Sequence, residues 1–94
     1  MSTVYVTKAE FTRQKARLTR ATNSGDPLEV LAAVEKTLAE WRGKAWPDDW
    51  SRWARALDDA YYAYVRSDAY DDDEAVNEGR IAKRFREAFD EIHL

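Results

Sequence analysis

Apolar side chains recur every three or four residues between Asp26 and Gly43, and this spacing constrains the fold more than any other feature. Such positions fall on one face of an α-helix, because the helix turns by about 100° per residue. Asp26 can cap the free amides of a first turn, Pro27 suits the first helical position, and Gly43 suits a left-handed residue that ends a helix. The pattern predicts a buried helical face. Its members are Leu28, Leu31, Val34, Leu38 and Trp41.

Three further segments carry helical signals of the same kind. Thr7 and Glu10 form a capping box, in which the hydroxyl accepts from the glutamate amide and the carboxylate reaches back to the cap. Pro47 and the two aspartates that follow it are typical of a first helical turn. The acidic run before the last apolar stripe is typical of a loop. The predicted helices span about 7–22, 27–42, 47–66 and 72–92, and the acidic loop spans 67–74.

Four helices with short connections predict an all-α fold, a small antiparallel bundle of three to four helices in a single domain, residues 1–94. The first helix has a thin apolar stripe, chiefly Phe11 and Leu18. We therefore expect it either to pack loosely or to complete its apolar face against another molecule. The predicted core consists of Leu31, Val34, Leu38, Trp41, Trp50, Trp53, Leu57, Tyr61, Phe85 and Ile92.

Composition and residue placement disfavour catalysis. The chain has no cysteine, so it has no disulfide, thiolate zinc site or cysteine nucleophile. The single histidine, His93, lies next to the C-terminal residue, and no pattern places a serine beside it. We expect a non-enzymatic protein without cofactor or metal. The longest apolar run, 30–34, is far shorter than the ~20 residues of a membrane span. The first residues lack the features of a signal peptide, so we expect a cytoplasmic protein.

Charge is distributed unevenly along the chain. Residues 1–25 carry five basic side chains and one acidic side chain, whereas the remainder carries ten basic and seventeen acidic ones. Arg13, Arg17 and Arg20 fall within one narrow sector of the first predicted helix. Three interpretations stay open for this stripe. It binds nucleic acid, it docks on the acidic part of the same chain, or it faces solvent.

The outer face of the third predicted helix carries charges of both signs. Asp48 and Arg52 are four residues apart, as are Arg55 and Asp59, and this spacing predicts ion pairs along the helix. We expect these pairs to form a solvated face rather than a site.

Two aromatic residues stand apart from the helical stripes. Trp46 precedes a proline, which favours an extended backbone, so it either covers the junction between the second and third helices or projects as a binding anchor. Tyr62 lies off the stripe of its helix and is predicted to be exposed. The predicted partner-binding residues are Phe11, Arg13, Arg17, Arg20, Trp46 and Tyr62.

Two stretches, LTRATNSGDPLEVL at 18–31 and WPDDWSRWARALDDA at 46–60, together with TKAEF at 7–11, carry a resemblance. They resemble small uncharacterised proteins encoded by bacteriophages of actinobacteria, over about the first two thirds of the chain. The resemblance implies a phage protein that works in a bacterial cytoplasm or within a virion. It supplies no catalytic residues.

The sequence thus predicts a non-enzymatic protein–protein interaction module of phage origin that binds a host or phage protein. Two alternatives stay open. One is nucleic-acid binding through the basic first helix. The other is a homo-oligomeric structural protein, in which the first helix of one copy completes the core of another.

Overall fold

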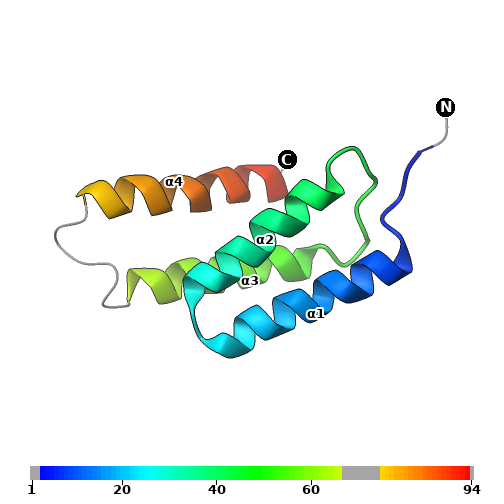
Figure 1. Ribbon diagram of the computed structural model, residues 1–94. Coiled ribbons are helices and arrows are strands. Elements are labelled where there is room, and N and C mark those ends of the chain that lie inside the picture. The colour runs from blue at the N-terminus through cyan, green and yellow to red at the C-terminus, as the bar shows by residue number, and fades with distance from the viewer. Residues whose placement is uncertain (1–2, 67–74, 94) are drawn as a thin grey trace.

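The computed structural model describes residues 3–66 and 75–93, which form an antiparallel bundle of α-helices in up–down–up–down order (Figure 1). The all-α prediction is confirmed. No helix in these two ranges is both long enough and apolar enough to cross a membrane. The helices are α1 (Lys8–Ser24), α2 (Pro27–Trp41), α3 (Ser51–Val65) and α4 (Ala75–Ile92).

The first two helices begin at the predicted caps. The Thr7 hydroxyl accepts from the Glu10 amide at 3.1 Å, and the Asp26 carboxylate accepts from the Leu28 amide at 2.9 Å. The capping box is only half formed, because the Glu10 carboxylate accepts from the Thr7 hydroxyl at 3.2 Å instead of reaching the cap amide. α1 runs two residues beyond its predicted end and stops at Gly25, whose φ of 75° is left-handed.

α3 begins four residues later than predicted. The amides of Trp50, Arg52 and Trp53 donate to carbonyls three residues earlier, at 3.2, 3.2 and 2.9 Å. Such bonds wind the chain more tightly than an α-helix, so residues 47–50 form turns and regular helical spacing starts at Ser51. Trp50 is therefore half-buried rather than part of the core as predicted.

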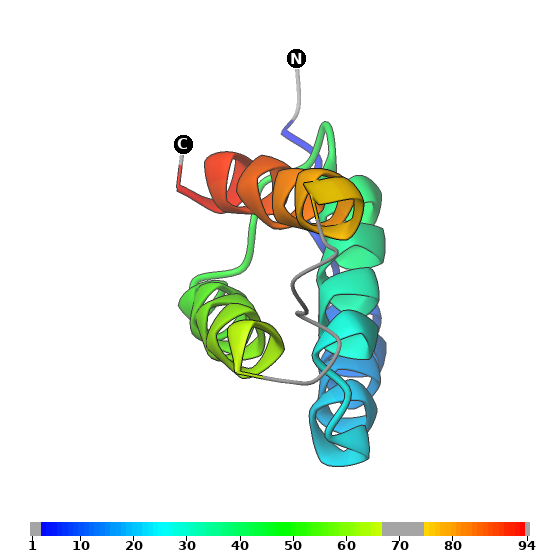
Figure 2. The same ribbon diagram turned by 90° about the vertical axis from the view of Figure 1, so that its left-hand side faces the viewer.

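α2 is the central helix of the bundle. It packs against α1, α3 and α4, and α3 also packs against α4 (Figure 2). Tyr61, predicted in the core, is half-buried at its edge, with its ring 5.3 Å from that of Phe85. α4 is described from Ala75, so the predicted start at 72 and the predicted loop at 67–74 lie outside the described residues. The largest fully buried side chains are Trp41, Trp53, Tyr64, Phe85, Leu31, Leu38, Leu57, Ile92, Val34 and Thr37.

The segment before α1 lies along the connection between α2 and α3, an arrangement that the sequence patterns do not predict. Tyr5 and Ala45 form an isolated parallel bridge. The Val6 amide donates to the Ala45 carbonyl at 3.2 Å, and the Ala45 amide donates to the Val4 carbonyl at 2.7 Å. The side chains of Val4 and Tyr5 stay largely exposed. Val6 is partly buried against the core, so backbone hydrogen bonds and this one side chain hold the segment in place.

Candidate functional site

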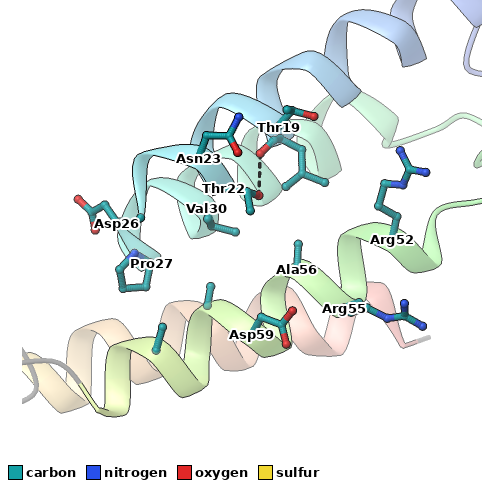
Figure 3. A pocket seen from close by; sticks show the side chains of 14 residues that line it. Thr19, Thr22, Asn23, Asp26, Pro27, Val30, Arg52, Arg55, Ala56 and Asp59 are labelled. Atoms are coloured by element: carbon teal, nitrogen blue, oxygen red, sulfur yellow. Dashed lines mark hydrogen bonds between the residues drawn. The ribbon is translucent and has the colours of Figure 1, made fainter.

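A groove separates α1 from α3, because both helices pack on α2 rather than chiefly on each other (Figure 3). Its volume is about 480 Å³. α1 and α3 run in the same direction, so its walls are parallel helices (Figure 1). Leu18, Val30 and Ala60 line it and are buried, which makes the floor apolar. The remaining lining residues are Thr19, Thr22, Asn23, Gly25, Asp26, Pro27, Arg52, Arg55, Ala56, Asp59 and Ala63.

The α3 wall of the groove is built from alanines. Ala56, Ala60 and Ala63 recur at helical spacing and all line the groove. The large apolar residues of α3, such as Trp53 and Leu57, are buried in the core instead. Methyl groups are too short to reach α1, so the space between the two helices stays open. The alanine spacing is visible in the sequence, but it does not by itself show that α1 leaves this wall open.

The α1 wall carries threonines whose hydroxyl protons are already used. The Thr19 hydroxyl donates to the Lys15 carbonyl at 2.9 Å, and the Thr22 hydroxyl donates to the Leu18 carbonyl at 2.8 Å, as the dashed line in Figure 3 shows. Hydroxyls that donate back to their own helix do not need an acceptor on a partner. This wall is therefore less polar in practice than its composition suggests.

The charged side chains at the groove have a definite order. Arg52 and Arg55 lie toward the beginning of α3, Asp26 lies at the other end, and Asp59 lies between them (Figure 3). Within the described ranges, no hydrogen bond or ion pair engages the side chains of Arg52, Arg55 or Asp59. The ion pairs predicted along α3, Arg55 with Asp59 and Asp48 with Arg52, are therefore not formed. These charges are available to a partner.

The predicted basic stripe on α1 divides into residues of different kinds. Arg17 binds the Glu40 carboxylate at 2.7 Å and donates to the Thr37 hydroxyl at 3.1 Å. The hydrogen bond from Arg17 holds the pKa of Glu40 below its ordinary value of 4.5. Of the three interpretations of the stripe, docking on the acidic part of the same chain therefore applies to Arg17. Arg13 and Arg20 are exposed.

A polar seam joins α1 to α2, and it explains how a helix with a thin apolar stripe packs. Gln14 is 3% exposed, and its Oε1 accepts from Trp41 Nε1 at 2.8 Å. Its Nε2 donates to Glu40 at 3.4 Å. Lys44 binds Glu10 at 2.8 Å and holds the pKa of that carboxyl below its ordinary value. α1 thus completes its buried face with hydrogen bonds to its own chain, which neither predicted alternative included.

The predicted aromatic contacts lie in three different settings. The Trp46 ring is half-buried, 5.2 Å from Trp41 and 5.7 Å from Trp50, which matches a cover over the α2–α3 junction. Phe11 is half-buried, with its ring 6.4 Å from Trp41. Tyr62 is 61% exposed, as predicted. None of the predicted partner-binding residues lines the groove, and their role in binding stays a prediction.

The described lining residues of the groove are small and apolar residues together with threonine, asparagine, aspartate and arginine. They include no histidine, serine or lysine. His93 is exposed elsewhere, with its ring 6.4 Å from that of Phe89. No group of three or more histidine, aspartate or glutamate residues in 3–66 and 75–93 could hold a metal ion.

Comparison with protein-family models, with curated proteins and with solved structures finds no match to the chain. The resemblance to phage proteins therefore stays a prediction.

Proposed function

We propose that the protein is a non-enzymatic interaction module that receives a helix of a partner protein in the groove between α1 and α3. The observation that carries this proposal is an apolar floor bordered by Arg52, Arg55 and Asp59, whose side chains have no partner within the described ranges. In helix-in-groove recognition, the burial of apolar surface supplies affinity, and rim charges supply orientation and specificity. The groove combines both features.

The dimensions of the walls define the partner helix. Helices pack with their axes about 8–10 Å apart, and the shorter distances require small side chains at the contact. The alanines of α3 permit such a close approach. The partner helix presents a narrow apolar stripe to the floor. It carries acidic residues where it meets Arg52 and Arg55, and a basic residue where it meets Asp59.

The first two thirds of the chain resemble small proteins encoded by bacteriophages of actinobacteria, and this resemblance supports a phage origin for this module. We accordingly place its action in the cytoplasm of an actinobacterial host, on a partner encoded by the host or by the phage, a second copy of this chain included. Nucleic-acid binding has weaker support, because one of the three stripe arginines, Arg17, is engaged by Glu40. A partner protein needs no such basic surface.

Obstruction of the groove tests the proposal. The tagged chain is co-expressed with an untagged copy and recovered from nuclease-treated actinobacterial lysate. Ala63→Arg places a long side chain in the groove, whereas Ala32→Arg makes the same change at an exposed position of α2 outside it. We expect the wild-type chain and Ala32→Arg to retain a protein partner that Ala63→Arg loses.

Two results would contradict the proposal. In one, Ala63→Arg captures the same proteins, untagged copy included, as the wild-type chain. In the other, every protein captured by the wild-type chain disappears after nuclease treatment, which would favour nucleic-acid binding. Circular dichroism on the purified variants confirms that each one is helical.

A further inference from the structure

The groove face of α3 is complementary to itself in charge. Arg55 and Asp59 both line the groove, have opposite signs and are not paired with each other. Their four-residue spacing corresponds to about 6 Å along the helix axis. In a twofold contact, residue i of one copy meets residue j of the other, and j meets i. A twofold axis beside Leu57 therefore opposes Arg55 to Asp59 of a second copy and forms two identical ion pairs.

The direction of the walls favours the same arrangement. α1 and α3 run in the same direction (Figure 1), so a helix that enters between them antiparallel to α3 is antiparallel to both walls. Alternation of direction is the usual arrangement of neighbours in helical bundles, and it opposes the dipoles of the packed helices. The entering α3 brings its own alanines to the alanines of the wall, which allows the two helices to approach closely.

We infer that the helix received in the groove is α3 of a second copy, packed antiparallel, so that two chains form a symmetric dimer in which each α3 lies in the groove of the other. This inference rests on the proposed function and names the partner of that site. The core face of α3, with Trp53 and Leu57, stays on α2 and α4 of its own chain. The dimer thus uses only surface that each monomer leaves open.

Charge reversal with rescue tests the inference. Sedimentation equilibrium gives the dimer dissociation constant of the purified wild-type chain, Arg55→Glu, Asp59→Arg and the double variant Arg55→Glu/Asp59→Arg. Each single reversal places like charges opposite each other at both pairs. We expect it to raise the dissociation constant by at least about tenfold. The double variant restores opposite signs, and we expect it to recover the wild-type constant to within about threefold.

Asp58→Arg is the matched control, because Asp58 is exposed on the same helix and does not line the groove. It changes the net charge as Asp59→Arg does and leaves the dimer intact. Ala63→Arg is a second, independent disruption that obstructs the groove without charge reversal, and we expect it to yield a monomer. Thermal unfolding of each variant reports whether its monomer is still folded.

Several outcomes would overturn the inference. A wild-type chain that stays monomeric at high concentration excludes the second copy as occupant. The proposed function then survives if Ala63→Arg still abolishes capture of another protein from the lysate, and fails if it does not. Three results with a wild-type dimer would show that it does not use this face. Arg55→Glu leaves the dimer intact, or Asp58→Arg weakens it as much as Asp59→Arg does. In the third, the double variant fails to restore the wild-type dissociation constant.

Discussion

α1 and α4 both pack on α2, but they do so by different kinds of contact. α4 contributes a ring that is completely buried, Phe85, stacked 5.9 Å from Tyr64 of α3, and its Arg84 forms an ion pair with Glu35 of α2. α1 contributes the buried amide of Gln14, which accepts from Trp41, and the guanidinium of Arg17, which binds across to α2. Both helices form an ion pair with α2, but α4 also inserts a large, completely buried ring, whereas α1 inserts a buried amide.

The difference explains the groove. Hydrophobic burial is non-directional and scales with the area removed from water, so a helix held in that way covers as much surface as it can. Hydrogen bonds have strict geometry, so a helix held by them need not cover the apolar surface beside them. α1 buries only Gln14, Leu18 and Ala21, so its flank toward α3 is left without a helix against it. The thin apolar stripe of α1 and the open groove have the same cause.

The largest effect is expected where attachment is hydrophobic. Phe85→Ala removes a fully buried ring among Tyr61, Tyr64 and Phe89, and should lower the free energy of unfolding by about 3–5 kcal/mol. The total free energy of unfolding of a small domain is about 5–15 kcal/mol, so the midpoint of urea denaturation should fall strongly. The Phe89 side chain is half-buried, so Phe89→Ala should lower the free energy of unfolding by less than half as much. Equal losses would contradict the view that one buried ring dominates the attachment of α4.

A smaller effect is expected at the polar seam. Gln14→Met keeps the approximate volume but leaves the Trp41 indole N–H buried without its acceptor, which costs about 1–3 kcal/mol. Urea denaturation of Gln14→Met, Trp41→Phe and the double variant forms a double-mutant cycle that isolates the pair. We expect a coupling energy of about 1 kcal/mol or more. Zero coupling would mean that the hydrogen bond from Trp41 to Gln14 adds nothing to the attachment of α1.

Local chemistry explains why the starts of α1 and α2 and the end of α1 were predicted to within two residues. Thr7 and Asp26 cap through their own side chains, and Gly25 adopts a left-handed conformation, so a few adjacent residues suffice to predict the ends. The predicted start of α3 was wrong because Pro47 and the two aspartates after it suit a tight turn as well as a helical first turn. The choice between them is visible only in the i→i+3 bonds, and it moved Trp50 out of the core.

The candidate site could not be predicted in the same way, because it depends on the separation of two helices distant in sequence. Ala56 and Ala63 are ordinary helix-forming residues, and nothing local shows that α1 lies too far away to cover them. The buried position of Gln14 likewise depends on Trp41, 27 residues along the chain. A glutamine on a basic helix is normally exposed. Sequence patterns therefore predicted the faces of α2 and α3 that pack, and missed the face that is left open.

The smallest effect is expected in the pH dependence of the polar seam. The pKa of Glu40 lies below its ordinary value of 4.5, chiefly because of the hydrogen bond from Arg17. Near that pH the unfolded chain binds more protons at this site than the folded chain does. The contribution of Glu40 to stability is therefore present above pH 4.5 and is lost as the pH falls through the lower, folded-state value. The side chain of Glu40 is 38% exposed, which limits the contribution to less than about 1 kcal/mol.

Thermal unfolding at pH 7 and pH 3 measures this contribution. Glu40→Gln should unfold at a slightly lower temperature than the wild-type chain at pH 7. The difference should shrink at pH 3, because the stabilising contribution of the wild-type carboxylate is lost as the pH falls below 4.5. Glu87→Gln, at an exposed position of α4 with no ion pair in the described residues, is the control and should show no such convergence. If the difference between the wild-type chain and Glu40→Gln is the same at both pH values, the contact between Arg17 and Glu40 adds nothing to the seam. The attachment of α1 then depends on the hydrogen bond from Trp41 to Gln14, on the ion pair between Lys44 and Glu10, and on the burial of Leu18 and Ala21.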